Sequence, residues 1–439
     1  MNYRVACSLL VFGFIALLPM RARAIVEPSP APPPAAIINA EHPETFDPAA
    51  ATRAWLDTVP ADKKAKSDAY FEGGYWLILW DFLLSSAICV FFLATGLSAR
   101  IRNFAERMTR FKAMQVAVYA VFFVLIVAVL SFPLTYYAQF SREHAYGLAN
   151  QTFGPWFKEQ LIDLAINVVG LPIFLIVLYA VFRGAPRQWW VWGAVVTIIF
   201  IAVLNILAPV FIAPLFNKYE PLTDPTIRDP ILALARANQI PVTDVYQFDA
   251  SVQTSRVSAN VSGFLNTTRI SLNDNLLKQC SLPEIRYVMS HEMGHYVLNH
   301  AMKNVVAFSV LAFLMFFFLR LSFGWAVQKW GAGWDVRGIG DPAGLPLIVL
   351  LVGLLSFLGT PANNTITRTM EIEADAFGLN ASRESDGMAQ AALKLGTYRK
   401  LDPGPWEERI FFDHPSGRAR IRAAMDWKAA QLPCGDVKK

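Results

Sequence analysis

The chain has 439 residues, of which 54% are hydrophobic and only 17% are charged. Soluble proteins usually carry about 25% charged residues. The composition therefore argues against a wholly soluble protein and predicts that part of the chain lies in a lipid bilayer. The formal net charge is only +5, and no long basic stripe accompanies it, so we expect no nucleic-acid partner.

The first 24 residues have the layout of a secretory signal peptide. A short basic start precedes an apolar stretch from Ala6 to Leu18, and an Ala-Arg-Ala sequence ends at Ala24. The apolar stretch is short for a membrane span, which favours a signal peptide over the alternative of a short retained anchor. Either interpretation places residues 25–75 outside the cytoplasm, beginning with a Pro/Ala-rich tether over 25–36.

Six long apolar runs follow, and each predicts a membrane-spanning helix. Four of them lie within 76–215, and the other two form a predicted hairpin within 305–360. We expect the polar segments 216–304 and 361–439 to form the two parts of one domain outside the membrane. The runs are 76–98, 114–135, 161–182, 189–215, 305–323 and 345–360.

The charges between these runs predict an orientation. Three connections on one side of the membrane carry nine Lys and Arg residues, five of them within 99–112. The short connection on the other side, 136–160, carries two. Because basic connections stay in the cytoplasm, we expect 216–304 and 361–439 to face the periplasm from a bacterial inner membrane.

The first polar segment predicts a strand region followed by a helix. Residues 245–272 have short alternating runs broken by Ser, Gly and Asn-Thr, which predict a small antiparallel β-ribbon. Ser281 and Glu284 then form an S-x-x-E capping box ahead of an apolar pattern. The stretch SHEMGHYVLNH (290–300) is therefore expected to lie on a helix.

Two histidines of this stretch have the spacing of metal ligands. His291 and His295 are four residues apart, so their imidazoles share one face of the helix. Two neutral imidazoles at this spacing suit Zn²⁺, and Glu292 beside them can take a proton from a bound water. His300 would lie on a different face, and we interpret it as an interfacial or solvated histidine. The alternative is a polar helix end with satisfied histidines, so a third ligand is the test.

The third ligand is expected after the last apolar run. Glu371 and Asp375 share one face of a helix. Glu371 would complete a His–His–Glu site and leave the fourth position for water, and Asp375 would accept the free N–H of a ligand imidazole. Nearer the end, His414 and Arg420 could hold the oxyanion that develops during hydrolysis. A solvated acidic helix face and a basic C-terminal helix are the alternatives for these residues.

Four further residues leave alternatives open. Cys280 and Cys434 lie in polar regions and could pair if their side of the membrane is oxidising. Asp81 and Asp163 lie at or within apolar runs, where a transporter or a non-catalytic binding protein would use them. They could equally line a water-filled chamber or lie at the interface. The intact H-E-x-x-H motif with a glutamate ligand argues against a transporter or a non-catalytic binding protein.

From about residue 50 onward, the chain resembles the integral-membrane zinc metalloproteases that process CAAX prenyl proteins. The resemblance rests on separate motifs in the family's order, which makes it far more specific than one motif. The motifs are EHAYGLANQT (143–152), IAPLFNKYEPL (212–222), RISLNDNLL (269–277) followed by HEMGH, NTITRTMEIEAD (364–375) and HPSGRAR (414–420).

The resemblance implies a mainly α fold, in which a polytopic α-helical membrane barrel encloses a chamber. A gluzincin-like zinc metalloprotease domain with a small β-ribbon closes that chamber. By matching positions, His291, His295 and Glu371 would bind one Zn²⁺ per chain. Glu292 would be the general base in the hydrolysis of extended peptides that enter the chamber from the bilayer.

The resemblance also implies residues that meet the substrate. His414 and Arg420 would contact it or stabilise the transition state. An Asn-Ala-Tyr-like strand of the family pairs with the substrate backbone, and its positions are Ser258, Ala259 and Asn260 here. Ser258 stands where the family has the asparagine, so the side-chain contact of that asparagine is not expected here. Backbone pairing does not depend on this side chain and is still expected.

Two larger departures bear on the substrate. The first family helix corresponds to the expected signal peptide, which leaves six spans where seven would be expected. Eukaryotic members place the catalytic domain in the cytosol, whereas the charge pattern here predicts the opposite side. Prenylated cytosolic proteins are then not the expected natural substrates. Specific CAAX-type processing and quality control of membrane proteins both remain open as functions.

Overall fold

The computed structural model describes residues 46–262 and 268–432. The expected signal peptide and the Pro/Ala tether lie outside these residues. Cys434 does too, so its pairing with Cys280 stays a prediction. Within the described ranges, six helices are long and apolar enough to cross a membrane, as the six runs predict. They are α3 (Ala61–Ala94), α5 (Lys112–Tyr136), α7 (Phe153–Gly184), α8 (Trp189–Leu207), α12 (His300–Trp334) and α13 (Leu345–Ser382).

The last membrane helix extends well beyond its apolar run, 345–360. α13 continues without a break from its membrane portion into the polar segment that carries Glu371. It ends at Arg383, whose left-handed backbone stops the helix. The apolar run locates the span, but the capping residue sets the end of the helix. One continuous helix therefore leads from the bilayer portion to the expected third ligand.

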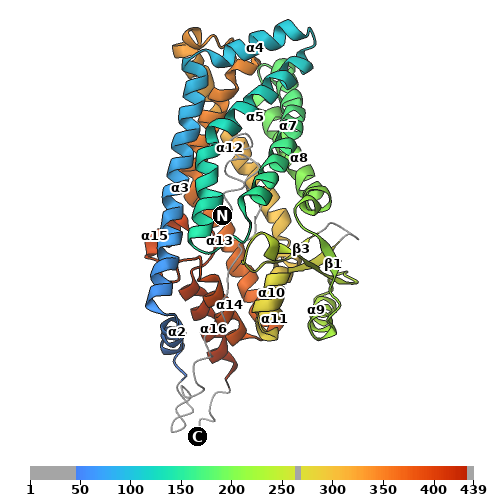
Figure 1. Cartoon of the computed structure of the whole chain (residues 1–439), viewed down its shortest axis with the longest axis vertical. Helices are drawn as coiled ribbons and strands as arrows, with labels where there is room; N and C mark the ends of the chain where they lie inside the picture. Colours follow the sequence, from blue (N-terminus) through green and yellow to red (C-terminus); the bar gives the residue numbers. More distant parts are fainter. Residues whose placement is uncertain (1–45, 263–267, 433–439) are drawn as a thin grey trace.

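The three basic connections meet at one end of the bundle, where α4 (Leu97–Met108) crosses it (Figure 1). Arg102 of α4 is buried, and its guanidinium nitrogens lie 2.6 Å from Asp335 and 2.7 Å from Asp341 in the third connection. Arg183, in the second connection, packs against the same loop. These contacts support the expectation that the three connections share one side of the membrane.

A small sheet forms at the other end of the molecule (Figure 1). Its strand order is β1-β2-β4-β3, and the pair β2–β4 is parallel while the other two pairs are antiparallel. The sheet is therefore mixed, and the expectation of a purely antiparallel ribbon is wrong. Parallel pairing joins strands that are distant in sequence, which short-range alternation does not specify. The strands are β1 (Tyr219–Pro221), β2 (Val245–Phe248), β3 (Ala259–Ser262) and β4 (Arg269–Asn273).

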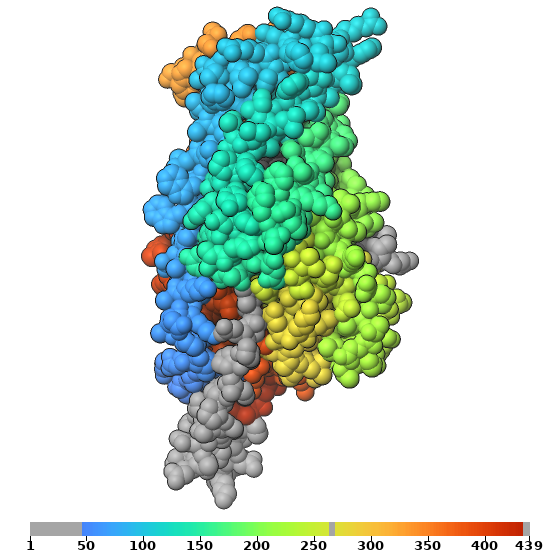
Figure 2. Space-filling model, in the orientation of Figure 1, coloured from blue at the N-terminus to red at the C-terminus, as the bar shows by residue number. Residues whose placement is uncertain are grey.

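The first and last helices among the described residues pack against each other. Ala51 and Trp55 of α2 share a buried core with Ala424 and Met425 of α16, and Figure 2 shows the N-terminal and C-terminal surfaces side by side there. The core that α2 and α16 share also includes Tyr287 of the expected catalytic segment. The remaining elements are α2 (Pro48–Asp57), α6 (Arg142–Ala145), α9 (Pro225–Ala237), α10 (Asp274–Gln279), α11 (Leu282–Val297), α14 (Ser385–Leu395), α15 (Pro405–Phe411), α16 (Gly417–Gln431), η3 (Tyr137–Ser141), η4 (Ala208–Ile212), η5 (Ala213–Leu215), η6 (Ala250–Val252) and η8 (Pro342–Gly344).

Candidate active site

The helix that carries HEMGH begins at the expected capping box. Ser281 precedes α11, and the backbone N–H of Ser281 donates to the Glu284 carboxylate at 2.6 Å. The buried Lys394 of α14 lies with its Nζ 2.7 Å from the same carboxylate, and it also donates to the backbone oxygen of Gln279 at 2.6 Å. The start of α11 is thus fixed by its own cap and by a buried ion pair to α14.

Two glycines allow α11 and α13 to cross closely. A Cβ on Gly294 would lie 3.1 Å from the ring of Phe377, and a Cβ on Gly378 would lie 3.1 Å from the backbone nitrogen of His291. Contacts this short leave little room for a larger residue on either helix. The close crossing lets a carboxylate on α13 reach the imidazoles on α11.

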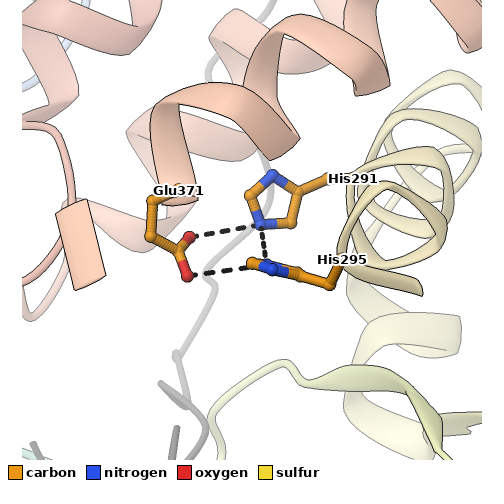
Figure 3. Close-up of side chains that lie close together, drawn as sticks. All are labelled: His291, His295 and Glu371. Carbon is orange, nitrogen blue, oxygen red and sulfur yellow. Dashed lines mark hydrogen bonds and ion pairs between the residues drawn. The ribbon is translucent and has the colours of Figure 1, made fainter. Parts of the chain in front are cut away.

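His291, His295 and Glu371 converge in this crossing (Figure 3). The two Nε2 atoms lie 3.2 Å apart. The Glu371 carboxylate lies 3.3 Å from Nε2 of His291 and 3.5 Å from Nε2 of His295. One ligand atom from each residue lies within 4.8 Å of the others. A donor set of two imidazoles and one carboxylate suits a catalytic zinc site.

Behind these residues lies a buried charged layer. Asp375 places one carboxylate oxygen 2.8 Å from Nδ1 of His291, and it accepts a hydrogen bond from Tyr287 at 2.8 Å. Arg420 donates to Asp375 at 2.9 Å and to Glu371 at 3.2 Å. Arg420 is therefore engaged by both carboxylates and holds them in place. Sequence reasoning did not single out Tyr287, because nothing local to it marks this contact.

His414 approaches the same carboxylate from the C-terminal segment. Its Nε2 lies 3.3 Å from Glu371, and its Nδ1 lies 2.8 Å from the carboxylate of Asp413. Asp413 is a residue that sequence reasoning missed. The only signal available was an acidic residue directly before a candidate catalytic histidine.

His300 lies beside His295 and is not solvated as the sequence reasoning expects. α11 ends at Val297, and Asn299 has a left-handed backbone with φ of 55° before α12 begins. His300 is 2% exposed, and its Nδ1 lies 2.8 Å from Nδ1 of His295. The expectation assumes an unbroken helix, whereas the break at Asn299 redirects the chain and brings the two imidazoles together.

The neighbouring charges act differently on the two imidazoles of α11. Burial disfavours the charged form of His291, but the carboxylates of Asp375 and Glu371 outweigh burial and raise its pKa to about 10. Burial and the charge of His291 lower the pKa of His295 to about 3. A proton on this pair is therefore held by His291.

The other expected residues lie on the same helix and on a neighbouring strand. Glu292 follows His291 on α11 and is half-buried. Ser258, Ala259 and Asn260 are buried in or just before β3, which is the last strand of the sheet on one side. Ala259 shares a hydrophobic core with residues of α11. The strand thus runs next to the helix that carries the candidate metal ligands.

Comparisons with known proteins match most of the chain. A family profile described as peptidase family M48 matches residues 221–428, and one described as CAAX prenyl protease N-terminal, five membrane helices, matches residues 48–218. An uncharacterized metalloprotease, YhfN, of Bacillus subtilis is 30% identical over 336 residues, which cover 76% of this chain and 78% of that protein. A CAAX prenyl protease 1 homolog of Arabidopsis thaliana is 30% identical over 295 residues, which cover 66% and 69%.

A solved structure has the same fold. The crystal structure of S. mikatae Ste24p matches with a TM-score of 0.69 and 21% identity, covering 97% of this chain and 99% of that chain. The mainly α membrane fold with a small sheet, as expected from the sequence, is therefore confirmed. Together with the profiles and the relatives, it shows that the chain belongs to peptidase family M48 and is an integral-membrane metalloprotease.

Proposed function

We propose that this metalloprotease is a zinc endopeptidase. His291, His295 and Glu371 would bind one Zn²⁺, and Glu292 would be the general base. The observation that carries the proposal is the convergence of these three donors from two helices, with ligand atoms within 4.8 Å of one another. Two imidazoles and a carboxylate leave the fourth tetrahedral position for water or substrate.

The side chains around the metal site have separate tasks in hydrolysis. Zinc held by these residues would supply a water with a lowered pKa and would polarise the scissile carbonyl. Glu292 takes the proton of the attacking water and passes it to the leaving amine. His414 has its Nδ1 against Asp413 and its Nε2 toward the site, so its protonated form would donate to the developing oxyanion. Arg420 keeps Glu371 and Asp375 oriented through its two hydrogen bonds.

An extended peptide would bind along β3. The sheet order leaves one edge of β3 without a partner strand among the described residues, and such an edge can accept a further strand through main-chain hydrogen bonds. Ser258, Ala259 and Asn260 would supply that backbone. Because β3 packs next to α11, a peptide added there would lie alongside Glu292 and the metal.

The membrane helices favour peptides that are extended or unfolded, since a folded protein does not reach a site closed by helices. The predicted periplasmic orientation also favours a second candidate function. Natural prenylated proteins are cytosolic, so a periplasmic active site would suit quality control of membrane proteins. Narrow cleavage sites would indicate a processing enzyme, and broad cleavage of unfolded peptides would indicate quality control.

The decisive experiment measures zinc content and peptide cleavage for the wild type and for Glu292→Ala. The peptides are a panel of extended sequences, both prenylated and unmodified. We expect the wild type to hold one zinc and to cut, and Glu292→Ala to keep zinc and lose cleavage by at least about 100-fold, because the general base is gone. Glu220→Ala, an exposed glutamate of β1, is the matched control and should cut normally. A wild type without zinc, or an active Glu292→Ala, would overturn the proposal.

A further inference from the structure

His295 and His291 are supported by different partners. The Nδ1 of His291 faces the Asp375 carboxylate directly, at 2.8 Å. The Nδ1 of His295 instead faces another imidazole, that of His300, also at 2.8 Å. His300 in turn has its Nε2 3.1 Å from the carboxylate of Glu373. A chain of three side chains therefore leads away from the metal-facing Nε2 of His295.

The donors and acceptors along this chain fit together in only one direction when Nε2 of His295 faces a cation. That nitrogen must keep its lone pair free, so the ring proton of His295 lies on Nδ1. The proton of His295 is then donated to Nδ1 of His300, which must be unprotonated. The proton of His300 consequently lies on Nε2 and is donated to Glu373, which accepts it as a carboxylate.

We propose that His300 and Glu373 are positioning residues for His295, which fix its tautomer and ring orientation and thereby raise the affinity of the site for its metal. This inference rests on the proposed zinc site. It assigns to a second histidine the task that a carboxylate usually performs for a metal-bound imidazole. Neither residue is a metal ligand, and neither touches the substrate.

The fold builds this arrangement from separate features. The left-handed Asn299 ends the path of α11 and starts α12 at His300, so that the ring packs behind His295 with 2% of its surface exposed. Glu373 comes from α13, on a different face from Glu371. Lys303, one turn into α12, lies with its Nζ 2.5 Å from Glu373. An adjacent cation keeps the terminal acceptor ionised and in position.

The burial of His300 means that its ring nitrogens need hydrogen-bond partners. A buried imidazole without partners would leave two polar nitrogens desolvated, which is unfavourable for each group. Here both nitrogens are occupied, one by a candidate ligand and one by a carboxylate. The carboxylate end is 42% exposed, whereas the Asp375 carboxylate behind His291 is 7% exposed. The carboxylate that ends the chain behind His295 is therefore more exposed to solvent than the carboxylate behind His291.

The test measures zinc affinity of the full-length protein in detergent by competition with a chelator. His300→Phe keeps an aromatic ring of similar size but removes both nitrogens. We expect it to weaken zinc binding by about 10–100-fold, the usual effect of losing a supporting partner of a metal ligand. His300→Gln keeps one acceptor and one donor, so it should recover most of the affinity. His144→Phe is the matched control, because the ring nitrogens of His144 lie against backbone oxygens of Phe140 and Gln151.

A second variant decides the question if His300→Phe does not fold. Glu373→Ala removes the terminal acceptor at a partly exposed position and should weaken zinc binding several-fold, with Glu373→Gln in between. The absorption spectrum of the Co²⁺-loaded protein gives a further readout, since altered ligand orientation should change its d–d bands. Unchanged zinc affinity in the folded His300→Phe, or in Glu373→Ala, overturns this inference alone. A wild type that binds no zinc overturns the proposed function instead.

Discussion

At the scale of single residues, the site is governed by what lies behind each imidazole. His291 faces a buried carboxylate. Burial lowers the pKa of His291, but the combined effect of Asp375 and Glu371 is larger and raises this pKa to about 10. A metal ligand must be a neutral imidazole, so metal binding has to release the proton of His291. The carboxylate that orients this ligand therefore also makes metal binding depend on pH.

Zinc affinity should rise with pH. His291 has a pKa of about 10 in the metal-free protein, so it is protonated at any lower pH. Each decrease of the pH by one unit should therefore weaken zinc binding by about tenfold. In Asp375→Asn the carboxylate is gone and the pKa of His291 falls, so the affinity should level off near neutral pH. The measurement is the zinc dissociation constant from about pH 6 to about pH 9. Asp386→Asn, at an exposed ion pair, should keep the full slope, and a pH-independent wild type would contradict this account.

At the scale of elements, the helices on which the site depends were predictable, and their surroundings were not. The capping box and the four-residue spacings act within one helix, so the placement of Ser281, Glu284, His291 and His295 on α11 follows from neighbours along the chain. The position of His300 depends on one left-handed residue, Asn299. A left-handed asparagine is one conformation among several that the residue adopts, so no pattern announces it.

The sheet and the buried charged residues behind the candidate ligands also depend on contacts that local sequence patterns do not specify. The parallel pairing of β2 with β4 and the contact of Arg420 with Asp375 join segments far apart in sequence. Such contacts are fixed by how the elements pack, which periodicity does not encode. Asp413 is next to His414, yet its role becomes visible only once the imidazole is seen to face Glu371.

The buried ion pair at the start of α11 gives a prediction for this element. Lys394→Ala would leave the Glu284 carboxylate, 1% exposed, without its cation. We expect the free energy of unfolding to fall by about 3–5 kcal/mol, the usual cost of an uncompensated buried charge. The double variant Glu284→Gln/Lys394→Met should recover most of this loss, because neither residue then carries a buried charge. The measurement is denaturant unfolding in detergent, and a loss below about 1 kcal/mol in Lys394→Ala would contradict the prediction.

At the scale of the whole molecule, the candidate site joins a membrane helix, α13, to the shorter helix α11, which precedes the membrane helix α12. α13 carries both a span and Glu371, and α12 begins at His300. The three candidate ligands are therefore held by helices, which suits ligands that must keep a fixed geometry, whereas His414 lies between α15 and α16. The same construction ties the side of the membrane on which the site lies to the topology of the bundle.

The topology gives the final prediction. The connections at the α4 end carry nine basic residues against two on the opposite short connection, so the α4 end should be cytoplasmic and the site periplasmic. In a chain whose native cysteines are replaced, Asp229→Cys on α9 should react with a membrane-impermeant maleimide added to intact spheroplasts. Arg107→Cys, an exposed residue of α4, should react only after the membrane is permeabilised. The reverse pattern would place the site in the cytoplasm, where prenylated proteins become the favoured substrates over unfolded periplasmic segments of membrane proteins.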